Sequence, residues 1–357
     1  MSTLYKSLSM NQITDLISAV GDKVTVLVQG EIGSGKSSIL KDISKRFPNH
    51  HTCYVDITTK DVGDFLVPKV RSVDGMDVCS FIPNEEFGFH VNKPVIIMLD
   101  EIGKAGKAVM NACLRLMLER KLGVFSLPKG SIVFGTTNLA VEGVGDLLPP
   151  HARNRVSVVK MRKPIATEWV ENFAIPNNID PAVIGTVLEF PTMFASFEDY
   201  NSAEQNNYIF DPRSPKPAFV SPRSMEKASD IVKVCRIMGD EVLTHALIGT
   251  IGEKAALDML TMIKLDGDLP LWKDIVANPT TTHIPKGAAA CCMLIAKATM
   301  NIEDNTCAAW MQYLSRMTAE AQGLFARMIT RNSTPKRSVV MRNKEFTDLI
   351  MDKQYLF

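Results

Sequence analysis

The sequence lacks the features of a membrane or secreted protein. Its most apolar run, Gly287–Ala296, has only ten residues and lies between two lysines, so it is too short to span a bilayer. The amino-terminal stretch MSTLYKSLSMNQITDL has no continuous apolar segment of the kind that a signal peptide needs. We therefore expect a cytoplasmic protein that has no contact with a membrane.

Cysteine and histidine patterns are also sparse. The seven cysteines are odd in number and contain no C-x-x-C pair, which favours buried thiols in a reducing compartment over a disulfide framework. The six histidines are scattered, and no Cys or acidic residue completes a metal-ligand pattern around His50 and His51. The sequence predicts no structural zinc site.

The chain has no excess of charge of either sign. It has 40 Lys and Arg against 39 Asp and Glu, and its net charge is +1. This balance argues against a protein held on DNA mainly by a sequence-independent electrostatic field, although it is compatible with a local basic groove. The 46% of hydrophobic residues indicate a globular chain. A length of 357 residues exceeds what one hydrophobic core usually organises, so we expect two or three structural units.

The first half of the chain alternates short apolar runs with helical patterns. The runs have strand length and are rich in β-branched residues: Val24–Val28, Cys53–Ile57, Val95–Leu99, Ile132–Phe134 with its flanks, and Val156–Val159. Such runs are typical of strands that are covered on both faces. Between them, Lys36–Phe47 has an apolar stripe at helical spacing. The alternation predicts an α/β core with a parallel five-stranded sheet.

The second half of the chain shows helical patterns only. The strand-like runs stop after about Lys163, and the polar, proline-rich residues 199–220 predict a long loop. Ser221 as N-cap and Pro222 in the first turn then start a helix that we expect to end at Gly239. We predict an α/β core over 1–163, a first helical part over 164–277 and a helical C-terminal extension over 278–357.

A phosphate-binding loop is predicted between the first strand and the first long helix. Residues 30–37 read GEIGSGKS and match the pattern G-x-x-x-x-G-K-[ST]. Glycines there let backbone N–H groups converge on phosphate oxygens, and the helix N-terminus favours negative charge. Lys36 would supply a point charge to the β- and γ-phosphates, and the Ser37 hydroxyl would bind Mg²⁺. We expect ATP to be bound by Gly30, Glu31, Ile32, Gly33, Ser34, Gly35, Lys36, Ser37 and Ser38.

Polar residues at the ends of two further strands complete the predicted site. The run Val95–Leu99 is followed by Asp100 and Glu101, and buried carboxylates at a strand end need cationic partners. In a P-loop protein, Asp100 would hold the Mg²⁺ shell, and Glu101 would orient and deprotonate the attacking water. Asn138, at the end of FGTTN, could hold the same water or contact the γ-phosphate. Its alternative role is to cap a turn at the strand end.

The order of these motifs resembles the AAA+ ATPases, and more closely their MoxR group. GEIGSGKS, VIIMLDE and FGTTN look like Walker A, Walker B and sensor 1, while LLPPHARNRVSVV and VSPRSMEKA look like the arginine-finger and sensor 2 segments. The resemblance implies a finger that reaches the γ-phosphate of a neighbouring subunit. Arg155 and Arg153 are both candidates, because this sequence departs from the commoner Asp-Arg-Phe. It also implies that Arg223 is sensor 2, on a helical lid over 164–277.

The resemblance further implies an oligomeric ring, a hexamer, because a finger supplied in trans requires a neighbour. We therefore expect an ATP-hydrolysing hexamer that remodels or activates a protein partner, which in this family often carries a von Willebrand factor A domain. Two alternatives stay open. One is a nucleic-acid motor or loader, which only the basic stretch Lys336, Arg337, Arg342 and Lys344 favours. The other is a nucleotide-switched scaffold with little turnover.

Two stretches look like the positions at which MoxR proteins carry inserted hairpins. They are DVGDFLVPK, after the second predicted strand, and LRLMLERKLGVF, after the Walker B motif. In the second stretch, Leu122 and Phe125 would lie at an exposed tip that contacts a protein client. Alternatively, these apolar residues fold back onto the edge of the sheet.

Overall fold

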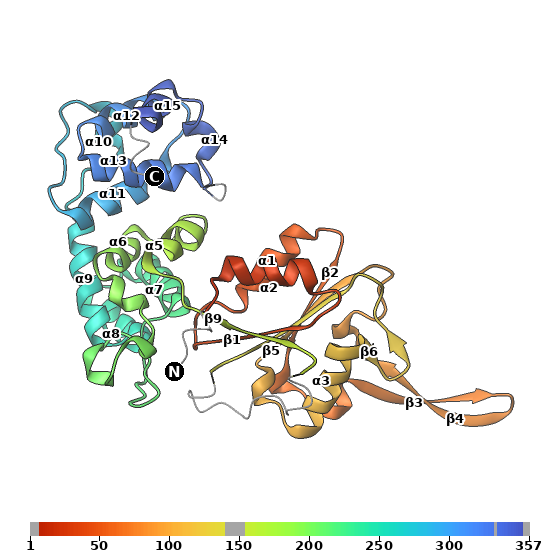
Figure 1. The fold of residues 1–357 in the computed structure, drawn as a ribbon. Helices are drawn as coiled ribbons and strands as arrows, with labels where there is room; N and C mark the ends of the chain where they lie inside the picture. Colours follow the sequence, from red (N-terminus) through yellow and green to blue (C-terminus); the bar gives the residue numbers. More distant parts are fainter. Residues whose placement is uncertain (1–6, 140–153, 332–333, 353–357) are drawn as a thin grey trace. The chain divides into compact units, whose positions relative to one another are not determined.

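The protein is described from a computed structural model, and the structure describes residues 7–139, 154–331 and 334–352. The chain forms two compact units, residues 1–163 and 164–357 (Figure 1). The predicted division of the second unit between residues 277 and 278 stays a prediction. Within the described ranges, no helix is both long and apolar enough to cross a membrane.

The first unit is built on a parallel sheet of five strands in the order β2-β5-β8-β1-β9. The strands are β1 Val26–Gly30, β2 His51–Asp56, β5 Val95–Asp100, β8 Ile132–Thr137 and β9 Ser157–Met161. Every neighbouring pair in this sheet is parallel. The predicted fold class, a P-loop α/β core with a five-stranded parallel sheet followed by a helical part, is confirmed.

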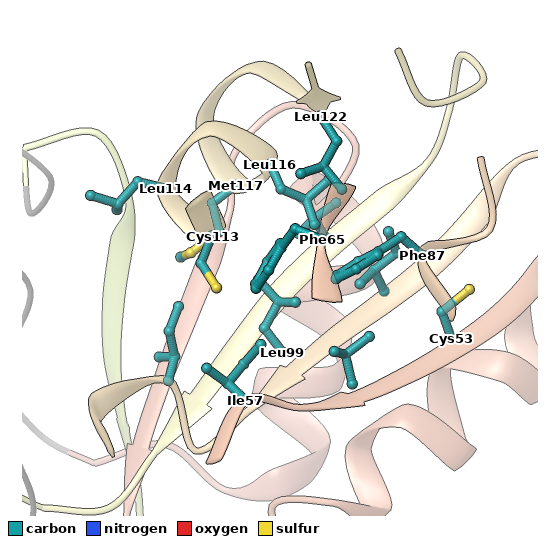
Figure 2. Close-up of a cluster of buried hydrophobic side chains, with 14 of the residues drawn as sticks. Cys53, Ile57, Phe65, Phe87, Leu99, Cys113, Leu114, Leu116, Met117 and Leu122 are labelled. Atoms are coloured by element: carbon teal, nitrogen blue, oxygen red, sulfur yellow. The ribbon is translucent and has the colours of Figure 1, made fainter. Parts of the chain in front are cut away.

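Helices cover both faces of this sheet, which explains why its three inner strands β1, β5 and β8 are almost completely buried. Along β5, Ile96 and Met98 point to the face covered by α1 (Met10–Val20) and α2 (Ser38–Arg46). Ile97 and Leu99 point to the other face, which α3 (Lys107–Glu119) covers. Figure 2 shows this second cluster, which brings side chains of α3 together with Phe65, Phe87 and Leu99. The two cores hold the carboxyl ends of the central strands in fixed positions.

Short helical turns connect the strands of the first unit. They are η1 Ile57–Thr59, η2 Val62–Asp64, η3 Glu85–Phe87 and η4 Ile102–Lys104. A long antiparallel hairpin of β3 (Leu66–Val73) and β4 (Met76–Pro83) projects from the body of this unit (Figure 1). Its turn is made by Asp74 and Gly75, both of which have positive φ. Most of its side chains are exposed.

A second, much shorter hairpin follows α3. It consists of β6 Lys121–Leu122 and β7 Phe125–Ser126. The expectation that Leu122 lies at an exposed tip is wrong, because Leu122 is only 3% exposed and belongs to the core cluster of Figure 2. Arg120 ends α3 in a left-handed conformation, and Leu122 follows it in the hairpin strand that contacts α3. The exposed apolar residues of this hairpin are Val124 and Phe125.

The second unit is helical. Its main helices are α5 Ala166–Trp169, α6 Pro181–Glu189, α7 Pro222–Cys235, α8 Asp240–Ile251, α9 Glu253–Gly267, α10 Trp272–Ala277, α11 Ala288–Asn301, α12 Cys307–Ser315, α13 Ala319–Thr330, α14 Arg337–Val340 and α15 Lys344–Asp352. Shorter turns are the π-helical η6 Val170–Ala174 and the 3₁₀ turns η7 Pro191–Phe194, η8 Phe197–Asp199 and η9 Ala203–Gln205. The buried helix α6 packs against α9 and α11.

The predicted helix start at Ser221 is confirmed, but the predicted end is not. The Ser221 side chain accepts a hydrogen bond from the backbone N–H of Ser224, and Pro222 is the first residue of α7. The helix ends at Cys235, four residues before Gly239. Gly239 instead precedes α8 with a φ of 100°, a conformation that glycine adopts without strain.

Candidate nucleotide-binding site

The loop between β1 and α2 has a backbone that favours glycine at three positions. Gly33 and Gly35 have φ values of 71° and 94°, which side chains rarely allow. At Gly30, a Cβ atom would lie 3.2 Å from the carbonyl oxygen of Met161 on the neighbouring strand β9. The three glycines therefore let the loop turn tightly at the carboxyl edge of the sheet.

Lys36 lies at the centre of this loop and is only 6% exposed. Its ammonium donates hydrogen bonds to the backbone oxygens of Gly30 and Glu31, at 2.9 and 3.0 Å. It also donates to Oδ1 of Asn138 at 2.7 Å. Because Asn138 follows β8, this bond joins the predicted phosphate-binding loop to the predicted sensor 1 residue.

Asp100 ends β5 and is held by four hydrogen-bond donors. Its Oδ2 accepts from the Ser37 hydroxyl at 3.4 Å and from the Tyr54 hydroxyl at 2.8 Å. Its Oδ1 accepts from the Thr136 hydroxyl and from the backbone N–H of Glu101. The residue is 7% exposed, and these donors fix the direction in which both of its carboxylate oxygens point.

Glu101 has a left-handed backbone conformation, with a φ of 55°. Such a conformation costs about 1–2 kcal/mol in a residue with a side chain, and active sites are among the places where it is retained. The turn directs the carboxylate toward Asn138, whose Nδ2 donates to Oε2 at 3.1 Å, and toward Lys104, whose ammonium is 3.2 Å from the same oxygen. Lys36, Asn138 and Glu101 thus form one continuous hydrogen-bonded chain.

The order of the strands explains why these residues meet. Lys36, Asn138 and Glu101 follow β1, β8 and β5, and these three strands are neighbours in the sheet. Carboxyl ends of parallel strands are the usual place for ligands in open α/β sheets. The turn η4 packs closely on β8 here, because a Cβ atom on Gly103 would overlap the Thr137 hydroxyl.

The residues of the loop fit a magnesium–nucleotide complex. The Ser37 hydroxyl and the Asp100 carboxylate are 3.4 Å apart, and Mg²⁺ is commonly bound by one or two such oxygen groups together with phosphates and water. The Ser34 hydroxyl is buried without a hydrogen-bond partner among the described residues. An unsatisfied donor at this position fits a phosphate oxygen. In the same described ranges, no group of three or more His, Cys, Asp and Glu side chains could hold a metal ion.

A buried ion pair joins the loop to the end of the first unit. The ammonium of Lys163 lies 2.6 Å from Oε2 of Glu31, and the two side chains are 4% and 8% exposed. Glu31 therefore contacts two lysines, Lys163 through its carboxylate and Lys36 through its backbone oxygen. Sequence patterns gave no sign of this pair.

The three predicted arginines lie in other segments of the chain. Arg155 lies just before β9 and is exposed, and Arg153 lies outside the described residues. Arg223 is an exposed residue in the first turn of α7, in the second unit. The finger and sensor 2 roles of these arginines stay predictions. Tyr54, Thr136 and Lys104 contact the site residues but were not predicted to do so.

The sequence of the first unit matches a known domain. Residues 25–130 match the profile of the AAA domain of the dynein-related subfamily. This part of the chain is similar to an AAA domain. The matched segment contains the phosphate-binding loop, Asp100 and Glu101, and it ends before Asn138. A search of curated protein sequences gives no match.

Three solved structures are distantly similar to this chain. A mutant of RuvB from Thermotoga maritima has a TM-score of 0.38 and 12% identity, with 86% of each chain covered. The T. maritima RuvB Holliday junction branch migration motor has a TM-score of 0.36 and 14% identity over the same shares. A candidate ATPase from Cytophaga hutchinsonii has a TM-score of 0.35 and 13% identity, covering 71% of this chain and 88% of the other. Scores this low decide nothing about activity.

Proposed function

We propose that the protein binds ATP with Mg²⁺ and hydrolyses it at the carboxyl edge of the sheet. The observation that carries this proposal is the hydrogen-bonded chain from Lys36 through Asn138 to Glu101. It links a phosphate-binding ammonium to a carboxylate that is 23% exposed at its side chain and can reach a water molecule. The match of residues 25–130 to an AAA domain supports the same proposal.

Each side chain of the site has a separate role in the proposed hydrolysis. Lys36 and the backbone N–H groups of residues 33–37 bind the phosphates, and Ser37 and Asp100 hold the metal ion. Bound Mg²⁺ supplies positive charge that offsets the charge of the phosphates. Glu101 accepts a proton from the attacking water, and the Asn138 amide orients either that water or Glu101 itself. Lys104 contributes a positive charge beside the Glu101 carboxylate.

Substitution of Glu101 by Gln tests the assignment of the base. Gln keeps an oxygen that can accept from Asn138, so ATP binding should persist, whereas hydrolysis should fall by about 10²–10⁴-fold because the amide takes no proton. Glu119→Gln is the matched control, since Glu119 is an exposed residue of α3 paired with Arg115. Lys36→Ala should abolish binding. Hydrolysis by the Glu101 variant at the unmodified rate would show that another group is the base.

We further propose that ATP hydrolysis drives the remodelling of a protein partner, in a MoxR-like manner. Exposed apolar side chains on both faces of the hairpin β3–β4 support a protein partner, because burying them against a partner is favourable. These residues are Val67, Val70, Val73, Met76, Phe81 and Ile82, with exposures from 39% to 69%. A partner that carries a von Willebrand factor A domain fits this proposal. The basic stretch at the C-terminus supports nucleic acid less well, since Arg342 is paired with Asp304.

A ring of subunits, as a hexamer, is part of the same proposal. Arg155 is exposed on the first unit and is available to a neighbouring subunit, with Arg153 as the second candidate finger. Light scattering with and without a non-hydrolysable ATP analogue tests the ring, and a monomer under both conditions contradicts it. If the ring forms, the variants Arg155→Ala and Arg153→Ala identify the finger. The variant that lacks the finger should lose hydrolysis but keep ATP binding. Stimulation of hydrolysis by DNA that is lost at raised salt would instead favour a nucleic-acid motor.

A further inference from the structure

Tyr54 reaches from the edge of the sheet to the buried Asp100 carboxylate. It lies on the edge strand β2, next to β5, and its register partner is Met98, two residues before Asp100. The Tyr54 residue is 51% exposed, yet its hydroxyl donates to Oδ2 of Asp100 at 2.8 Å. This is the same oxygen that accepts from Ser37.

The two donors on Oδ2 differ in strength. The distance of 3.4 Å from Ser37 is long for a bond between a hydroxyl and a carboxylate, whereas 2.8 Å from Tyr54 is typical. A Ser37 hydroxyl that binds a metal ion turns its lone pair to that ion, and its bond to Asp100 then depends on the new geometry. Within the described residues, Tyr54 is the other side-chain donor on this oxygen. Tyr54 is therefore placed to help hold the carboxylate when the metal arrives, together with the two donors on Oδ1.

We propose that Tyr54 is a positioning residue that sets the affinity of this site for Mg²⁺ through Asp100. The proposal rests on the proposed ATP-binding function. Residues that orient a metal ligand commonly change metal affinity by about 10–100-fold when they are removed. Because the Tyr54 ring is half exposed and Thr136 and the Glu101 N–H still hold Oδ1, the expected change lies at the lower end of that range.

The test compares Tyr54→Phe with Tyr208→Phe. Tyr208 is a matched control in the second unit, where its hydroxyl donates to Oδ2 of Asp258 at 2.7 Å. Binding of a fluorescent ATP analogue is measured across a Mg²⁺ titration and in excess EDTA, and hydrolysis is measured across the same titration. Thermal unfolding checks that both variants are folded.

Tyr54→Phe should raise the Mg²⁺ concentration needed for half-saturation about tenfold. Its affinity for the analogue in EDTA should stay unchanged, and hydrolysis should recover at saturating Mg²⁺. Tyr208→Phe should match the unmodified protein throughout. The proposed role of Tyr54 is wrong if Tyr54→Phe needs the same Mg²⁺ concentration as the unmodified protein. It is also wrong if Tyr54→Phe loses as much affinity for the analogue in EDTA as it loses in the presence of Mg²⁺. If the unmodified protein binds no analogue at any Mg²⁺ concentration, the proposed function itself fails.

Discussion

Breaking the buried ion pair between Glu31 and Lys163 should destabilise the first unit strongly. The two charged atoms are 2.6 Å apart, and neither side chain is more than 8% exposed. Lys163→Met leaves the Glu31 carboxylate buried without its cation, and the loss of one partner from such a pair costs about 3–5 kcal/mol. With a urea slope of about 2 kcal/mol/M, a loss of about 3 kcal/mol lowers the unfolding midpoint by about 1.5 M.

The assay must report on the first unit alone. All three tryptophans, Trp169, Trp272 and Trp310, lie in the second unit, so tryptophan fluorescence follows that unit and serves as an internal reference. Hydrogen exchange of the amides of β1 and β8 reports on the first unit. Those amides should lose protection in Lys163→Met, while the fluorescence transition in urea stays where it is.

Two further variants separate the buried charge from other effects. Lys45→Met removes an exposed pair with Asp42, and such pairs contribute at most about 1 kcal/mol, so protection should hardly change. In the double variant Glu31→Gln with Lys163→Met, no unpaired carboxylate is left buried at position 31, and much of the lost stability should return. A Lys163→Met protein as stable as Lys45→Met would refute the reasoning that Glu31 is a buried charge dependent on Lys163.

Two other predictions concern the contacts of η4 and the cysteines. Gly103→Ala should push η4 away from Thr137 and displace Glu101. Hydrolysis should fall by roughly 10²-fold, while ATP binding is retained. Gly106→Ala should have little effect in the same assays, because a Cβ atom there meets no atom within 4 Å. Burial raises the pKa of the Cys113 thiol to about 12, so its reactive thiolate is scarce at pH 8. A thiol reagent at that pH should label the exposed Cys79 in the native protein, but it should label Cys113 only after unfolding. Rapid native labelling of Cys113 would contradict this.

The main features of the fold could be predicted because they depend on local patterns. Apolar runs identified the five strands. The three inner strands β1, β5 and β8 are covered on both faces and so have no polar side to alternate with, whereas the edge strands β2 and β9 are partly exposed. The capping signal at Ser221 placed the start of α7 correctly. Its end was predicted wrongly because the apolar pattern continues to Met238, while the backbone leaves the helix at Cys235.

The long hairpin begins within DVGDFLVPK, the stretch where the resemblance predicted a hairpin, and its turn carries a further signal. The dipeptide Asp74-Gly75 lies between stretches of β-branched residues, and Asp-Gly is a strong indicator of a tight hairpin turn. No comparable sequence signal indicates that Leu122 is buried. Whether an apolar residue at a hairpin lies at the tip or in the core depends on the direction in which the preceding helix ends, which is set here by the left-handed conformation of Arg120.

The contacts of the site that were missed depend on the order of the strands. Glu31 and Lys163 meet because β9 lies beside β1, and Tyr54 reaches Asp100 because β2 lies beside β5. The motifs located Lys36, Asp100 and other residues at strand ends, but strand order is a property of the whole sheet. No local pattern in the sequence predicts which side chains from neighbouring strands will touch.

The central position of β8 explains why an amide is needed at residue 138. This strand lies between β1 and β5, so the residue after it faces both the Lys36 ammonium and the Glu101 carboxylate. A carboxylate at this position would accept from Lys36 but repel Glu101, and an ammonium would do the reverse. An amide presents an acceptor to one neighbour and a donor to the other, which matches the observed bonds from Lys36 to Oδ1 and from Nδ2 to Glu101. Asn138 can therefore transmit a displacement of Lys36, such as phosphate binding would cause, directly to the proposed catalytic base.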